Sequence, residues 1–322
     1  MINTNRGSDD DLLVRVSWYY HKLKLTQKEV GDKLGLSRQK VQRLLQKARN
    51  NGIIQVEIKS PKANLLSIEK NLSDQYQIED AVVAPHASSD EGLRDSLGKV
   101  AATYLKNLLD DEGINVIGTG WGRTLRSFVD SFQPLEERQE MDVVSLIGNL
   151  LIDTAVNPYE IANTLARKLS ANCYNIWAPS IVEDKERAEI FKSEQWIKET
   201  LDKTRTADLI IVGLGPVSEK ATLYNLEYLS KNDLQSLKSK GAVGDILGRY
   251  FDKQGELIDL ELHDRVIAPT LEEIRDGKGK VIVVAGGDFK LKAMQGALNG
   301  NLIDILVTDE KLAGNLVNGG TS

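Results

Sequence analysis

The chain has 322 residues, 41% hydrophobic and 27% charged, which is typical of a soluble globular protein with room for two domains. The first ten residues lack an apolar signal region, and no apolar run reaches the roughly 18 residues that cross a membrane, so we expect neither a secreted nor a membrane protein. A single cysteine, Cys173, and three widely spaced histidines argue against disulfides, metal sites and metal cofactors. We therefore expect a cytoplasmic protein.

The net charge of −6 is unevenly distributed along the chain. Residues 1–60 contain 12 Lys and Arg against 6 Asp and Glu, whereas the remaining residues contain 29 against 41. A basic segment joined to an acidic body is typical of a protein in which one domain binds nucleic acid. The acidic body would be repelled by DNA, which favours one docking orientation. A chance fluctuation of charge in a short segment is the alternative.

The first predicted elements are two helices. Residues 10–23 place apolar side chains at helical spacing and predict an amphipathic helix. Thr26 to Glu29 then has the pattern of a capping box, in which Thr26 caps a new helix and Glu29 reaches back to it. This helix is expected to end at Leu34, because Gly35 can adopt the left-handed conformation that terminates a helix.

A further helix is expected from its N-cap, Ser37, to about Asn50. Its buried stripe would consist of Val41, Leu44 and Leu45. Two short helices joined by a glycine-containing turn predict a helix–turn–helix, whose second helix enters the major groove of DNA. Residues 53–58 alternate apolar and polar side chains, which predicts a strand and a winged-helix-like domain that ends at Pro61.

Polar side chains at the start of the second helix of this motif are candidates for base contacts. Arg and Lys can hydrogen-bond guanine, and Gln can bind adenine with two hydrogen bonds. The candidate DNA-binding residues are Thr26, Ser37, Arg38, Gln39, Lys40, Gln42, Arg43 and Lys47. A solvated charged face on a small helical bundle is the alternative. We expect double-stranded operator DNA as a partner and at least a dimer, because such motifs read two-fold operators as dimers.

After the DNA-binding domain, residues 1–60, a larger domain is expected over residues 61–322. It begins with a charged amphipathic segment, 64–77, which predicts a linker helix and a candidate dimer contact. Strands and helices then alternate, which indicates a Rossmann-like α/β domain around a largely parallel sheet. The predicted strands are 80–84, 114–118, 143–147, 172–177, 209–213, 280–285 and 303–308, and the predicted helices include 93–109, 123–132, 160–169 and 288–298.

Four glycine-rich segments in this domain, 118–122, 213–215, 241–248 and 285–287, mark candidate ligand loops. A glycine loop at the start of a helix offers backbone N–H groups and the helix dipole to an anion. The first loop is neither a dinucleotide fingerprint, which needs Gly where Arg123 stands, nor a P-loop. Each loop alone could be a tight strand-to-helix turn. Together, with charged residues nearby, they favour a small polar or phosphorylated ligand.

The sequence resembles the SorC family of sugar-responsive bacterial transcriptional regulators. The segments that carry the resemblance are LTQKEVGDKLGLSRQKVQRLLQKARNNGIIQVEI, IGTGWGRTL, ADLIIVGLGPV, GAVGDILGRYFD and VAGGDFK, which together span nearly the whole chain. The resemblance implies a helix–turn–helix joined to a sugar-phosphate-binding domain of the phosphosugar isomerase type. It also implies a homotetramer whose binding to its operator depends on ligand.

The resemblance also implies roles for single residues. Asp245 would lie against sugar hydroxyls, Lys290 near the phosphate or a ring oxygen, and the 118–124 loop along the pocket. The candidate effector-binding residues are Gly118, Thr119, Gly120, Trp121, Gly122, Arg123, Thr124, Gly213, Gly215, Asp245 and Lys290. Some members hold their effector through a Schiff-base lysine in the middle of this domain. No such lysine can be placed here, so we expect reversible binding without a cofactor.

These observations predict a DNA-binding repressor of a carbohydrate or polyol utilisation operon, controlled by a phosphorylated sugar or polyol. The main alternative is a sugar-phosphate isomerase or deaminase of the same fold, since Asp245 has the chemistry of a general base. The basic N-terminal module argues against an enzyme, which has no need of it. A structural DNA-binding protein without a ligand is a second alternative, and the large α/β domain argues against that one.

Overall fold

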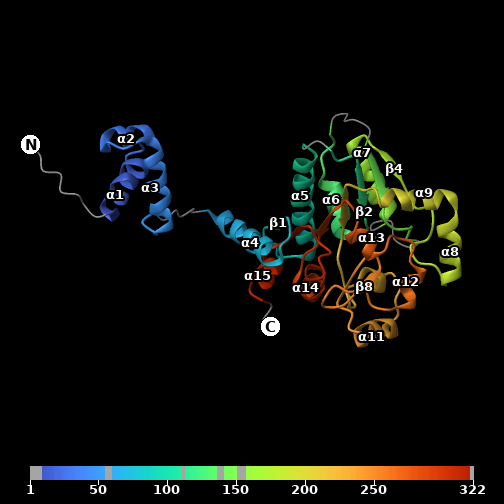
Figure 1. Cartoon of the computed structure of the whole chain (residues 1–322). Coiled ribbons are helices and arrows are strands. Elements are labelled where there is room, and N and C mark those ends of the chain that lie inside the picture. The colour runs from blue at the N-terminus through green and yellow to red at the C-terminus, as the bar shows by residue number, and fades with distance from the viewer. Residues whose placement is uncertain (1–8, 55–59, 111–112, 136–140, 151–156, 320–322) are drawn as a thin grey trace, which may run out of the picture. The chain divides into compact units, whose positions relative to one another are not determined.

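A computed structural model describes residues 9–54, 60–110, 113–135, 141–150 and 157–319 (Figure 1). The chain divides into two compact units, Met1–Ala63 and Asn64–Ser322. Within the described residues, the first unit contains helices only, and the second contains two β-sheets. Each unit is described by itself.

The first unit consists of α1 (Asp9–Ser17), α2 (Gln27–Leu34) and α3 (Arg38–Asn50). The predicted capping box is present, since Glu29 N donates to Thr26 Oγ1 (3.3 Å) and Thr26 N donates to Glu29 Oε2 (2.8 Å). Gly35 has a φ of 66°, so α2 ends in the left-handed conformation expected of this glycine. Between the helices lies a small apolar core of Val16, Val30, Val41 and Leu45.

Two predictions in this unit need correction. Residues 10–23 do not form one α-helix, because α1 ends at Ser17 and Trp18–Lys22 form a π-helical turn, whose wider spacing lets Tyr19 and Tyr20 both pack on the core. Pro61 does not end the module but begins α4 (Pro61–Tyr76), in a position where the missing proline N–H costs no hydrogen bond. Most of the predicted strand 53–58 lies outside the described residues.

The helix α4 covers the predicted linker segment 64–77. Leu72 is buried in the core of the second unit, and Val83 N donates a hydrogen bond of 2.7 Å to Glu69 Oε1. Leu66 is 60% exposed. Most of the apolar side of α4 is therefore packed within its own unit.

The second unit is built on a seven-stranded parallel sheet with the order β1-β10-β9-β5-β2-β3-β4. Its strands are β1 (Asp80–Ala84), β2 (Val116–Thr119), β3 (Asp142–Ser145), β4 (Asn172–Tyr174), β5 (Leu209–Val212), β9 (Lys280–Val284) and β10 (Ile305–Asp309). All seven predicted strands are present. The predicted strand 172–177 is shorter than expected, because β4 pairs only with β3 and does so over three residues.

Successive side chains of a strand point to opposite faces of the sheet, and both faces are buried, so the strands are apolar throughout. In β5, Ile210 and Val212 face one core, and Leu209 and Ile211 face the other. The second core is completed by α5 (Asp90–Leu109), α6 (Arg123–Ser131) and α7 (Pro158–Leu169), and the first by α4, α14 (Leu291–Asn299) and α15 (Glu310–Val317). The sheet is thus covered by helices on both faces (Figure 1).

A smaller antiparallel sheet has the order β6 (Gly215–Pro216), β7 (Gly244–Ile246) and β8 (Arg249–Phe251). The glycine-rich segment 241–248 is therefore no strand-to-helix turn. It holds β7 and a hairpin turn in which Leu247 and Gly248 have φ of 52° and 75°, the conformation that suits a two-residue hairpin.

The remaining helices of this unit come after β4 in the chain. The predicted helix 288–298 begins as a 3₁₀ turn before α14, because Gly287, with a φ of 98°, sets a tight entry. The remaining helices are α8 (Lys185–Ser193), α9 (Gln195–Thr204), α10 (Thr222–Asn225), α11 (Lys231–Ser239), α12 (Glu261–Arg265), α13 (Leu271–Arg275) and the 3₁₀ turn η3 (Asp288–Lys290).

Candidate functional site

In the first unit, α3 separates its polar side chains from its apolar ones. The exposed residues are Arg38, Gln39, Lys40, Gln42, Arg43 and Lys47. Val41, Leu45 and Ala48 are buried on the opposite side. The helix therefore presents a continuous polar face of the kind that enters a DNA groove.

The other two predicted DNA-binding residues have roles inside the unit. Ser37 Oγ accepts a hydrogen bond of 3.2 Å from Lys40 N, and Thr26 Oγ1 donates one of 2.8 Å to Glu29 Oε2. Both side chains cap helices, so they fix the turn that orients α3.

The second unit contains a cavity of about 340 Å³ at the carboxyl ends of β2, β5 and β9. After β2 the chain adds β3 and β4 on one side, then returns to place β5 on the other side of β2. The loops that leave two such neighbouring strands diverge, and open α/β sheets bind ligands at this reversal. The topology thus places the cavity where a ligand site is expected.

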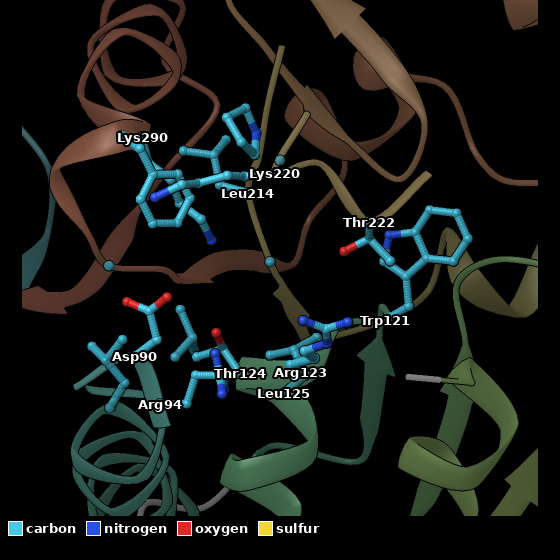
Figure 2. Close-up of a pocket in the computed structure, with 18 of the residues that line it drawn as sticks. Asp90, Arg94, Trp121, Arg123, Thr124, Leu125, Leu214, Lys220, Thr222 and Lys290 are labelled. Atoms are coloured by element: carbon cyan, nitrogen blue, oxygen red, sulfur yellow. The ribbon is translucent and has the colours of Figure 1, made fainter. Parts of the chain in front are cut away.

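One side of the cavity is formed by α5 and the first turn of α6 (Figure 2). It carries Arg94, Arg123 and Thr124. Gly122 leads into α6 with a φ of 121°, and no side chain caps this helix. Two guanidinium groups beside an uncapped helix N-terminus form a suitable environment for an anion.

Asp245 also lines the cavity and is only 6% exposed. Gly248 N donates a hydrogen bond of 3.1 Å to Asp245 Oδ2. Gly215 pairs with Asp245 across β6 and β7, and a Cβ at Gly215 would lie 1.9 Å from Asp245 Oδ1. The carboxylate is therefore held over bare glycine backbone, which no other residue could provide.

Lys290 lines the same side as Lys220, across from Arg94 and Arg123 (Figure 2). Burial raises the pKa of Asp245 to about 6 and lowers the pKa of Lys290 to about 8, although the two opposite charges partly offset these changes. Asp309 adds a second attraction for the Lys290 ammonium. The cavity thus contains a buried carboxylate and a half-buried lysine whose charges influence each other.

The cavity brings together eight of the predicted effector residues: Trp121, Gly122, Arg123, Thr124, Gly213, Gly215, Asp245 and Lys290. Gly118, Thr119 and Gly120 do not line it, so the prediction for the whole 118–124 loop needs correction. Gly118 and Thr119 are buried in β2, where a Cβ at Gly118 would lie 2.6 Å from Leu146 Cδ2. Glycine at that position is explained by packing.

Several lining residues were not predicted from the sequence, among them Asp90, Arg94, Glu219, Lys220 and Phe289. Arg94 lies within a helix and follows no glycine motif, so nothing in its neighbourhood signals a site. It reaches the cavity because α5 packs closely on α6: a Cβ at Gly98 would lie 2.5 Å from the backbone carbon of Ser127. Gly98, inside a predicted helix, was the available signal of this close approach.

In the part of the chain that the structure describes, no group of three or more His, Cys, Asp or Glu side chains is arranged to hold a metal ion. Among those same residues, no helix has the length and apolar character needed to cross a membrane.

Known proteins resemble the chain over most of its length. Residues 60–318 match a family described as "Putative sugar-binding domain". The chain is 33% identical over 311 residues to the transcriptional regulator LsrR of Enterobacter sp. (strain 638), with 95% of this chain and 92% of the relative covered. It is 29% identical over 311 residues to the erythritol catabolism regulatory protein EryD of Brucella abortus (strain 2308), with 96% and 97% covered.

Solved structures show the same fold. The full-length sorbitol operon regulator SorC from Klebsiella pneumoniae has a TM-score of 0.75 at 25% identity, covering 97% of this chain and 100% of that one. A DeoR family transcriptional regulator from Listeria monocytogenes has a TM-score of 0.72 at 29% identity, covering 78% and 98%. Since the family match spans most of the chain and the similarity to LsrR spans nearly all of it, the chain belongs to the SorC family of sugar-binding transcriptional regulators.

Proposed function

We propose that this regulator represses a carbohydrate or polyol utilisation operon and that a phosphorylated sugar or polyol controls its binding to operator DNA. Two proteins similar to it are named for such systems, the sorbitol operon regulator and the erythritol catabolism regulatory protein. Each unit supplies one part of the machinery: an exposed polar face on α3 and a polar cavity in the α/β unit.

The observation that carries this proposal is that a buried carboxylate and an uncapped helix N-terminus line one cavity. A carboxylate accepts hydrogen bonds from hydroxyls, whereas phosphate oxygens accept them from N–H groups and guanidinium. We therefore assign the sugar hydroxyls to Asp245. The phosphate is assigned to the first turn of α6, with Arg123 and Thr124, and to Arg94 on α5.

Lys290 belongs to the hydroxyl end in this arrangement. Asp245 and Asp309 both attract its ammonium group, so much of its charge is already compensated. The same carboxylates would repel a phosphate placed beside Lys290. An ammonium can instead donate hydrogen bonds to a ring oxygen or a hydroxyl.

The proposal includes binding without turnover. A carboxylate with a pKa near 6 also has the chemistry of a general base, which an isomerase would need. Similar proteins that span nearly the same length are nevertheless named as regulators. Long incubation with a bound sugar phosphate, followed by NMR of the small molecule, should return it unchanged; formation of an isomer would make the chain an enzyme.

A thermal-shift screen of the full chain tests the effector class. The probes are phosphate monoesters of erythritol, sorbitol, fructose and glycerol, and the unphosphorylated parents are the matched controls. A ligand at 100 times its Kd stabilises a protein by roughly 2.7 kcal/mol, which is readily measured. At least one ester should raise the Tm, and Arg123→Ala should reduce that rise. An equal response to the parent compound would remove the phosphate from the proposal, and no response at all would remove this effector class.

We also propose that the regulator works as a homodimer or homotetramer. One helix–turn–helix reads one half-site, so a two-fold operator needs two copies. Leu66 on α4 remains 60% exposed within its own unit and is available to such an interface. Light scattering at micromolar concentration should give at least twice the mass of the chain. A monomer with full operator affinity would rule the assembly out.

A further inference from the structure

A second cavity, of about 310 Å³, lies in the α/β unit and shares no lining residue with the first. Its walls come from α8, α9, β8 and the segment that leads into α13. Figure 1 shows α8 and α9 beside α12 and α13 in this part of the unit. Four cationic side chains line this cavity against two carboxylates: Lys192, Lys198, Arg205 and Arg249 against Asp202 and Glu273.

Arg249 is the unusual member of this set, because it is 96% buried, with only 4% of its surface exposed. Its terminal nitrogens donate to the backbone oxygens of His263 and Ala268, the latter at 3.2 Å. Its Nε has no hydrogen-bond partner among the residues that the structure describes. Within the described part of the chain, no carboxylate forms an ion pair with Arg249. Its hydrogen-bond partners are backbone oxygens, and Glu273, Glu272 and Asp264 attract its charge from beyond ion-pair distance.

The two carboxylates of the cavity are already used by other groups. Glu273 accepts from Arg205 Nε (2.8 Å) and from Thr270 N (2.9 Å). Asp202 is paired with Arg205 as well. A single guanidinium therefore forms the ion pairs of both carboxylates, and neither of them pairs directly with Arg249.

Two ammonium groups add to this excess. Lys192 on α8 and Lys198 on α9 line the cavity, and over the described residues neither ammonium makes a hydrogen bond or an ion pair. Burial and the nearby Arg249 lower the pKa of Lys192. Glu273 and Asp264 attract both Lys192 and Arg249 from beyond ion-pair distance. The three cations still repel each other across the cavity, and a bound anion would relieve this repulsion.

We infer that this cavity binds the phosphate group of a small anionic molecule through Arg249, Lys192 and Lys198. The two ammonium groups supply the donors, Arg249 adds a buried positive charge beside them, and a phosphate dianion supplies negative charge. The cavity is large enough for more than inorganic phosphate. This inference does not depend on the proposed effector site.

The place of Arg249 in the fold gives such a site a direct connection to the effector cavity. Arg249 begins β8, and Asp245 lies in β7, on the other side of the Leu247–Gly248 turn. Asp245 Oδ2 accepts a hydrogen bond from Gly248 N in the turn, and Arg249 directly follows Gly248 in the chain. One short hairpin thus carries a charged residue into each cavity.

Pyrophosphate is a suitable probe, and lysine acetylation followed by peptide mass spectrometry gives a local readout. Lys185, at the start of α8 and outside the cavity, is the internal control. At a pyrophosphate concentration of about ten times the Kd, roughly one site in ten is free. We therefore expect acetylation of Lys192 and Lys198 to slow about tenfold and acetylation of Lys185 to stay unchanged. Unchanged acetylation of Lys192 and Lys198 at about 10 mM pyrophosphate, enough for a millimolar site, would overturn the inference.

A variant pair separates this site from binding elsewhere on the chain. In Lys192→Met, pyrophosphate should no longer protect Lys198, whereas the control Lys185→Met should keep that protection. Full protection of Lys198 in Lys192→Met would remove Lys192 from the site and contradict the inference. Because the two cavities share no lining residue, phosphate bound in the effector cavity does not shield Lys198 directly, and the Lys192→Met comparison identifies protection that arises in this cavity. The test also remains valid if no sugar phosphate binds in the effector cavity.

Discussion

Asp245 is a buried carboxylate, and within the described residues its only hydrogen bond is the one that it accepts from Gly248 N. Burial raises its pKa from 3.8 to about 6, so the folded chain favours the protonated acid. The stability that this acid contributes is complete below pH 3.8 and is lost as the pH rises through 6. At neutral pH the ionised group therefore destabilises the unliganded protein.

The first prediction is that Asp245→Asn separates stability from binding. An amide keeps the hydrogen bond from Gly248 but carries no charge, so its free energy of unfolding at pH 7.5 should be higher by about 1–3 kcal/mol. This gain should disappear below pH 4, where wild-type Asp245 is protonated. Affinity for the effector should fall about 10- to 150-fold, since hydrogen bonds to a charged group are lost. Denaturant unfolding at both pH values and titration calorimetry measure these effects.

A loss of stability together with unchanged affinity would instead make Asp245 a structural residue outside the binding site. Lys290→Ala is the companion variant, because the ammonium is the charge that favours ionised Asp245. It should weaken the same hydroxyl end of the ligand. Phosphate-end variants such as Arg123→Ala should reduce discrimination between an ester and its parent sugar.

The second prediction concerns Arg38 and Gln39, which are exposed in the first turn of α3. Replacing either by Ala should cost about 1–3 kcal/mol on an operator selected by the wild-type protein from random DNA, and little on unrelated DNA, because base contacts carry specificity. Arg49→Ala, in the last turn of the same helix, is the matched control. Equal losses on both DNAs, measured by fluorescence anisotropy, would reassign the two side chains to phosphate contact.

Among single residues, those next to glycine motifs were predictable and those inside helices were not. Asp245 lies within one glycine-rich segment and Lys290 follows another, and both line the cavity. Arg94 is one of several charged residues on α5, and only the packing of α5 against α6 directs it to the site. A local pattern carries no information about such tertiary contacts.

At the level of elements, the β6–β7 pair positions the site. The third prediction is that Gly215→Ala, whose Cβ would lie 1.9 Å from Asp245 Oδ1, displaces the carboxylate and reduces effector affinity at least tenfold in a folded protein. Gly314→Ala is the control, because that helical position has no neighbour within 4 Å. Calorimetry on both variants is the measurement, and wild-type affinity in Gly215→Ala would show that the carboxylate does not need this position.

The turn of the helix–turn–helix has a similar constraint. The fourth prediction is that Gly31→Ala, whose Cβ would lie 2.5 Å from the backbone oxygen of Leu36, destabilises the first unit by about 1–3 kcal/mol and weakens operator binding. Effector affinity should stay at the wild-type value, since the cavity lies in the other compact unit. A change in effector affinity with unchanged operator binding would contradict the assignment of operator binding to the first unit and effector binding to the second.

Most elements were predictable because burial and capping leave strong periodic signals. The helix caps at Thr26 and Ser37 and the seven parallel strands are examples. The β7–β8 hairpin was missed, because its residues resemble a glycine-rich loop and its strands are only three residues long. The π-helical turn at Trp18–Lys22 was also missed, since helical periodicity does not reveal a local widening of the helix.

At the scale of the whole molecule, one chain carries a helix–turn–helix unit and a separate unit with a ligand cavity. The ligand can change operator affinity only if it binds more tightly to one of two states of the protein. Coupling of this kind is reciprocal and typically corresponds to a 5- to 150-fold change in affinity. We therefore expect cavity variants to change the response of operator affinity to ligand. Their operator affinity without ligand should stay unchanged.

The most direct test is the operator affinity of the full chain measured across a titration of the sugar or polyol phosphate that gives the largest thermal shift. For the wild type, we predict that saturating ligand weakens operator binding by at least about fivefold. For Asp245→Asn, the operator affinity without ligand should equal that of the wild type, and the ligand concentration at half response should rise about 10- to 150-fold. Operator affinity that does not change at any ligand occupancy, or identical titrations for the two proteins, would contradict the account.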